Sequence, residues 1–162
     1  MRNRPERIGS GVAAAVMAGA LVAGCGGGEP LSRAEFTDRV NAACEVLRRD
    51  SDDVRAGQEP GATGETVRRY LEANAANLRD LIDRVDDLDA PSVVSQDFER
   101  LVELLDQYAE GLEDLATRVR ADQGLRNVFE AHPSKVAELN AIAAEATDLV
   151  AGLGFSECIL TA

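Results

Sequence analysis

The 162-residue chain carries 29 Asp and Glu against 17 Lys and Arg, a formal net charge of −12. A surface of that sign repels phosphate backbones and anionic headgroups, so the composition argues against nucleic-acid binding and against electrostatic adhesion to a membrane. The length suits one domain with a substantial core, and an aromatic content of 4% predicts that Leu, Val and Ala form most of it.

The first 24 residues have the pattern of an export signal. Met1 to Arg7 form a basic n-region, and Ile8 to Val22 carry no charge. This apolar run is shorter than the roughly 20 residues that a spanning helix needs, and glycines interrupt it. We therefore expect residues 1–24 to be cleaved. The alternative is an uncleaved helical anchor.

The apolar run ends in a sequence that resembles the lipobox of bacterial lipoproteins: an aliphatic residue, small residues and an obligatory cysteine, here Leu21-Val22-Ala23-Gly24-Cys25. The resemblance implies cleavage after Gly24 and a lipid, such as diacylglycerol with palmitate chains, on Cys25. Two acyl chains anchor a protein stably in a membrane, because each methylene buried in the bilayer contributes roughly 0.8 kcal/mol to the free energy of binding. We expect residues 25–31 to be a lipidated, flexible tether at the outer face of the cytoplasmic membrane.

The remaining residues, 32–162, carry apolar stripes at spacings of three and four, which predict helices. The first helix begins at a capping box, with Ser32 as N-cap and Glu35 three residues later, and ends at Gly57. The other stripes span 67–88, 94–119 and 136–150, the last preceded by a short apolar turn and by Pro133. With Gly or Pro in the connections and no strand pattern, residues 32–162 are predicted to be an all-α, antiparallel four-helix bundle.

The cysteines predict one disulfide. Once Cys25 carries lipid, Cys44 and Cys158 remain. Two cysteines outside the cytoplasmic membrane most simply form a disulfide, which here would tie the first helix to the C-terminal segment and close the bundle. A redox or metal-binding pair is the alternative, but it lacks CxxC spacing and the chain has one histidine.

The whole region after the tether resembles a group of small actinobacterial secreted proteins and lipoproteins of uncharacterised function. The features that carry the resemblance are a cysteine midway along the first helix, a Leu-rich second helix, a long third helix and a closing segment; in this chain they are Cys44, the helix ending near Ala90-Pro91, the 94–119 helix and Leu153 to Cys158. The resemblance implies the fold, the disulfide and the location, and it implies no activity.

Residues with catalytic potential are sparse. His132 is the single histidine, and no partner for a catalytic base or a metal site stands beside it. The acidic clusters at 50–53 and 86–89 lie at helix ends, and neither follows calcium-loop spacing. We therefore expect no catalytic residues, no metal and no cofactor, and the chain is not expected to be an enzyme.

Two polar residues occupy seam positions where apolar residues are expected. Asn74 lies on the second helix and Tyr108 on the third, so they form a candidate interior polar pair. Such a pair fixes helix register or lines a small pocket. The simpler interpretation is two hydrogen-bonded polar groups at the end of a core.

These observations favour a non-catalytic envelope lipoprotein that presents a helical surface to an unknown protein partner. The alternative is a small-ligand or cation binder that uses the bundle interior near Asn74 and Tyr108, or the acidic helix ends. An enzyme of unrecognised type is the third candidate.

Overall fold

The computed structural model describes residues 31–158. The expected signal sequence, Cys25 and residues 159–162 lie outside the described residues. Within 31–158 the secondary structure consists of five helices and contains no strand; the helices are α1 (Arg33–Ala56), α2 (Glu65–Asp86), α3 (Ser95–Thr117), α4 (Leu125–Ala131) and α5 (Pro133–Leu153). The prediction of an all-helical fold is confirmed for this part of the chain.

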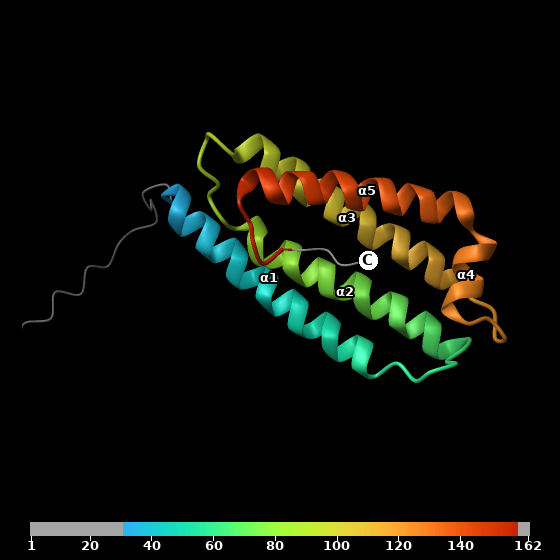
Figure 1. Ribbon diagram of the computed structural model, residues 1–162. Helices are drawn as coiled ribbons and strands as arrows, with labels where there is room; N and C mark the ends of the chain where they lie inside the picture. The colour runs from blue at the N-terminus through green and yellow to red at the C-terminus, as the bar shows by residue number, and fades with distance from the viewer. Residues whose placement is uncertain (1–30, 159–162) are drawn as a thin grey trace, which may run out of the picture.

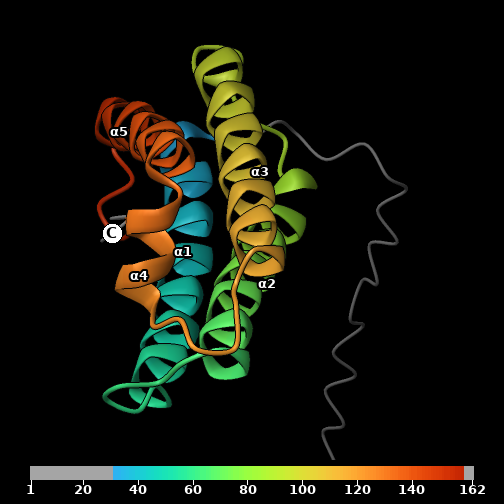
Figure 2. The same cartoon turned by 90° about the vertical axis from the view of Figure 1, so that its right-hand side faces the viewer.

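The long helices form a bundle in which neighbours in sequence are also neighbours in space. α1 packs on α2, α2 on α3, and α3 on α5, while the short α4 contacts α5 (Figures 1 and 2). α1 and α5 are therefore the outer members of the row and have little direct contact with each other. This arrangement leaves the inner faces of α1 and α5 only partly covered by helix packing.

α1 begins at the capping box that the sequence predicts. The Glu35 backbone N–H donates to Ser32 Oγ at 3.3 Å, and the Ser32 backbone N–H donates to Glu35 Oε2 at 3.1 Å. The Ser32 hydroxyl also donates to Glu35 Oε2 at 2.6 Å, and the hydrogen bonds from this hydroxyl and from the Ser32 backbone N–H lower the pKa of the Glu35 carboxyl. Two N–H groups that a helix start leaves without partners are thereby satisfied. Leu31, just before the cap, packs against the core.

The chain bends at Pro133, which separates α4 from α5. His132 precedes the proline with φ −127° and ψ 54°, outside the helical region, because the proline ring disfavours helical geometry in the residue before it. Pro133 itself is the first residue of α5, where its missing N–H has no consequence. The predicted fourth helical region is therefore two helices, and α4 folds against α5.

Three phenylalanines form an aromatic cluster at the end of the bundle where α1 begins. The ring centroids of Phe36 and Phe98 lie 4.8 Å apart, and Phe155 lies 6.0 Å from Phe36 and 6.2 Å from Phe98. The three side chains are buried. Three of the chain's six aromatic residues are thus gathered at one point, and the other buried core residues are aliphatic apart from the Cys44–Cys158 disulfide.

The C-terminal segment returns from α5 to α1 and is bonded there covalently. Cys44 and Cys158 form a disulfide with a Cα–Cα distance of 4.9 Å, which confirms the predicted pair. Beside it, the Glu157 backbone N–H donates to Asn41 Oδ1 at 3.2 Å, and Arg48 Nη1 lies 3.0 Å from Glu157 Oε2. The segment thus connects the two outer helices.

Gly64 allows two loops to pack closely at the end of the bundle opposite the aromatic cluster. The Gly64 backbone N–H donates to the Gln123 carbonyl at 3.0 Å, with φ at +53°. A Cβ at this position would lie 2.6 Å from the Ala121 carbonyl oxygen, so both the backbone conformation and the close contact require glycine. The α1–α2 loop is therefore held against the α3–α4 loop.

Candidate functional site

A cavity of about 500 Å³ lies between the outer helices, within the roughly 300–1,000 Å³ of small-molecule sites. α1 forms one wall, α4 and α5 form the opposite wall, and residues of α2 and α3 lie between them. The cavity exists because α1 and α5 have little direct contact. The C-terminal segment closes part of it through Glu157 and Cys158.

The walls of this cavity are largely apolar. α1 contributes Leu47 and α3 contributes Leu112, while Val136, Leu139 and Ala143 of α5 face them. Leu112 and Leu139 are buried, and the other three are partly buried. An aliphatic wall of this kind binds apolar groups by removing their surface from water.

The two polar seam residues predicted from the sequence both line the cavity. The Asn74 side-chain Nδ2 donates to the Tyr70 carbonyl oxygen at 2.8 Å, one turn earlier on α2. The structure gives no hydrogen bond between Asn74 and Tyr108 among its described residues. The residues therefore share one cavity without forming a direct pair.

Tyr108 is one of two tyrosines in the cavity wall, the other being Tyr70. Its side chain is half-buried, and burial raises the pKa of its phenol; the neighbouring Tyr70 adds to the rise. The phenol is consequently neutral at physiological pH. A neutral hydroxyl beside an amide offers hydrogen bonds to an uncharged polar group of a ligand.

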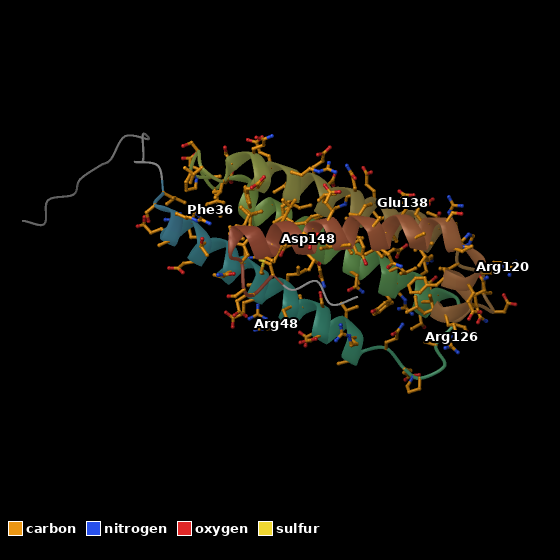
Figure 3. All side chains as sticks on the ribbon, turned by 45° about the horizontal axis from the view of Figure 1, so that its top comes forward. Phe36, Arg48, Arg120, Arg126, Glu138 and Asp148 are labelled. Atoms are coloured by element: carbon orange, nitrogen blue, oxygen red, sulfur yellow. A yellow bond between two sulfur atoms is a disulfide. The ribbon has the colours of Figure 1, made fainter. Side chains whose placement is uncertain are left out.

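Charged residues stand at the opening of the cavity on the α1 side. Arg48 pairs with Glu157, and Arg55 Nη1 lies 3.5 Å from Asp52 Oδ1. Figure 3 shows the Arg48 side chain extending from α1. The two cations and two anions balance, so this rim does not select a ligand of one charge.

The disulfide lies in the cavity wall and separates it from a second, much smaller space. Cys44, Leu47 and Cys158 line the large cavity and also a fully apolar cavity of about 20 Å³ on the aromatic side of the bundle. That volume is about the size of one water molecule, and its apolar lining offers a water no partners. The large cavity is therefore the candidate site.

The side chains that could bind a metal ion do not lie close together in the described part of the chain. Within residues 31–158 no group of three or more His, Cys, Asp or Glu side chains is placed to hold a metal ion. His132 lies between α4 and α5 and does not line the large cavity. In the same part of the chain, no helix has the length and apolarity needed to cross a membrane.

Two polar residues of the site, Asn74 and Tyr108, were identifiable from the sequence, whereas its apolar walls were not. Asn74 and Tyr108 interrupt regular apolar stripes, which is a visible signal. Val136, Leu139 and Ala143 follow the pattern of ordinary core residues, and only the separation of α1 from α5 leaves them facing a cavity. Phe129 of α4 also lines the cavity and is 36% exposed.

Comparison of the chain with protein-family models, with curated proteins and with solved structures finds no match in any of the three.

Proposed function

We propose that this chain is an exported lipoprotein whose helical domain binds a small apolar molecule with an uncharged polar group. The observation that carries the ligand-binding proposal is the cavity of about 500 Å³, with aliphatic walls and with Asn74 and Tyr108 at its inner surface. A mostly apolar cavity with a few polar groups is the usual form of a small-molecule site. The ligand's polar group would bond to the amide and the phenol.

The cavity favours a small ligand over a protein-binding surface. A large contiguous apolar patch on a protein surface marks a site of interaction with another protein or a membrane. On the described residues, the large apolar side chains that are exposed are Val93, at 75%, and Phe129, at 36%. They stand on different segments, the α2–α3 loop and α4, and do not form a patch by themselves. Protein binding is therefore the second hypothesis, without a surface to support it.

The proposal also places the domain at the outer face of the cytoplasmic membrane through a lipid on Cys25. It rests on the lipobox-like residues 21–25 and on the resemblance to small actinobacterial lipoproteins, both of which are sequence patterns. The domain is proposed to be an antiparallel four-helix bundle with α4 as a short addition, a description supported by the α1–α2, α2–α3 and α3–α5 packing. The disulfide suits an oxidising compartment.

The anchor predicts a defect in maturation when its cysteine is replaced. Cys25→Ala leaves no thiol to carry the lipid, so we expect an unprocessed precursor that keeps residues 1–24. Intact-mass spectrometry of the membrane fraction measures this directly, with the unaltered chain showing the loss of residues 1–24 plus the mass of the lipid. Normal processing of the Cys25→Ala chain would contradict the lipoprotein proposal.

The ligand site predicts that filling the cavity weakens the binding of an apolar probe. Ala143 is partly buried and lines the cavity, whereas Ala144, next to it on α5, is exposed. With the full chain in lipid nanodiscs, Ala143→Phe is expected to weaken binding of anilinonaphthalene sulfonate by about tenfold, roughly 1.4 kcal/mol, because the ring takes the ligand's space. Fluorescence titration, with the signal of empty nanodiscs subtracted, measures the affinity.

Ala144→Phe is the matched control and should leave the affinity unchanged, since its ring extends into solvent. Both variants should keep a cooperative thermal transition, which separates a filled cavity from a loosened fold. Equal affinities for the two variants would show that the probe does not bind in this cavity.

A further inference from the structure

The large cavity is elongated along the helix axes. On α1 its lining residues run from Cys44 to Arg55, a distance of about 16 Å at a rise of roughly 1.5 Å per residue. The disulfide stands at one end. At the other end α4 begins beside the α1–α2 loop, since a Cβ on Gly124 would lie 3.6 Å from the Ala62 carbonyl oxygen, and Leu125 of α4 lines the wall. This shape suits a linear molecule better than a compact one.

The polar groups of the cavity lie between apolar residues and not at its ends. On α2 the lining positions are Tyr70, Leu71, Asn74 and Leu78. Leu71 and Leu78 thus lie about one helical turn to either side of the Asn74 amide. Tyr108 of α3 is close to Tyr70, since the pKa of its phenol is raised by burial and also by Tyr70. A linear ligand whose polar group meets Asn74 and Tyr108 therefore needs apolar arms in both directions.

These two side chains can donate hydrogen bonds to a carbonyl oxygen. The neutral Tyr108 phenol carries one O–H donor. One N–H of the Asn74 amide is used by the Tyr70 carbonyl at 2.8 Å, and an amide carries a second N–H. An ester carbonyl fits such donors through its two lone pairs, and an ester has no donor of its own that burial would leave without a partner.

The charged rim argues against a ligand with an ionised head group. Arg48 Nη1 lies 3.0 Å from Glu157 Oε2, and Arg55 Nη1 lies 3.5 Å from Asp52 Oδ1. A carboxylate ligand would have to displace one of these anions, on a chain whose formal net charge is −12. An uncharged ester binds without that competition.

We propose that the ligand of the large cavity is a linear aliphatic ester, with its uncharged ester group in the interior of the chain and an alkyl arm on each side. The inference deepens the proposed function and rests on it, because it names the class of the small apolar molecule. The carbonyl accepts hydrogen bonds from Tyr108 and Asn74, while the arms extend toward the disulfide and toward α4. With C–C bonds of about 1.5 Å, an extended chain of about a dozen atoms fills the cavity's length.

Three isomeric probes test the position and the charge of the polar group. Hexyl hexanoate has its ester at the centre of the chain, decyl acetate has it near one end, and dodecanoic acid has a terminal carboxyl group. Each competes with anilinonaphthalene sulfonate for the full chain in lipid nanodiscs, and empty nanodiscs correct for partition into the lipid. We expect hexyl hexanoate to bind about fivefold more tightly than decyl acetate, the factor that one net hydrogen bond supplies.

Tyr108→Phe tests the hydrogen bond, because it removes the hydroxyl and keeps the ring. It is expected to weaken hexyl hexanoate binding about fivefold and to abolish the preference over decyl acetate. Infrared spectroscopy of hexyl hexanoate, isotope-labelled at its carbonyl carbon, gives a readout that a merely structural role would not move. The bound carbonyl band should lie at lower frequency in the unaltered chain and in the exposed control Ala144→Phe, and should return to the unbonded frequency in Tyr108→Phe.

The ester proposal and the ligand site fail in different ways. Equal binding of hexyl hexanoate and decyl acetate, or tighter binding of dodecanoic acid, in a chain whose dye binding responds to Ala143→Phe, would overturn the ester class and leave the ligand site intact. Dye binding that does not respond to Ala143→Phe would overturn the ligand site itself.

Discussion

Replacing both cysteines of the disulfide, Cys44→Ser with Cys158→Ser, is expected to lower the free energy of unfolding by about 2–5 kcal/mol. The bond joins residues 114 positions apart, so its loss releases a long loop in the unfolded chain, where loop-closure entropy is largest. It also frees the C-terminal segment from α1, and with it the buried Phe155. Urea denaturation followed by circular dichroism measures the change.

A reductant provides the control for this result. Dithiothreitol should destabilise the unaltered chain by a similar amount and should not affect the double variant, because Cys44 and Cys158 are both replaced there. A double variant as stable as the unaltered chain would show that the packing of Phe155 and the bonds of Glu157 hold the segment without the disulfide.

Phe36→Ala is expected to cost about 3–5 kcal/mol, the range for removing a large aromatic side chain from a core. Phe36 is 1% exposed and contacts both other rings of the aromatic cluster, so its loss leaves a cavity that Phe98 and Phe155 cannot fill without moving. Thermal and urea unfolding both report the change. The matched control is Phe129→Ala on α4, expected to cost roughly 1 kcal/mol or less because Phe129 is 36% exposed.

A double-mutant cycle separates the aromatic contact from simple burial. Phe36→Ala and Phe155→Ala should be coupled by about 0.5–1.5 kcal/mol, because their ring centroids lie 6.0 Å apart. Additive effects would show that each ring acts through its own buried surface. An equal cost for Phe36→Ala and Phe129→Ala would contradict the assignment of Phe36 to the core.

The helices could be predicted because their signals are local, and the disulfide because the chain offers few cysteines to pair. The Ser32 and Glu35 capping box, Gly57 at the end of α1, and the seam positions of α2 follow from hydrogen bonding and helical periodicity within a few residues. The disulfide followed from counting cysteines after assigning Cys25 to the lipid, an assignment that stays a prediction.

The cavity could not be predicted because it depends on the relative placement of α1 and α5. Leu139 shows why: its apolar side chain packs so closely on α3 that a Cβ at Gly111 would lie 2.5 Å from its Cδ2, and it also lines the cavity. A residue packed on a neighbouring helix and a residue that faces a cavity show the same apolar periodicity in the sequence. The separate α4 was suggested by Pro133, but its fold against α5 was not.

The disulfide also makes the domain a covalent ring, which changes how it responds to proteases. Cys44 and Cys158 enclose the interhelical loops at 57–64, 87–94 and 118–124, so a single cut in any one of them does not divide the chain into separate molecules. The pieces stay bonded through the sulfur atoms, and the helices on both sides of the cut keep their packing surfaces together. A nicked molecule therefore keeps its mass, apart from one added water, until a reductant opens the ring.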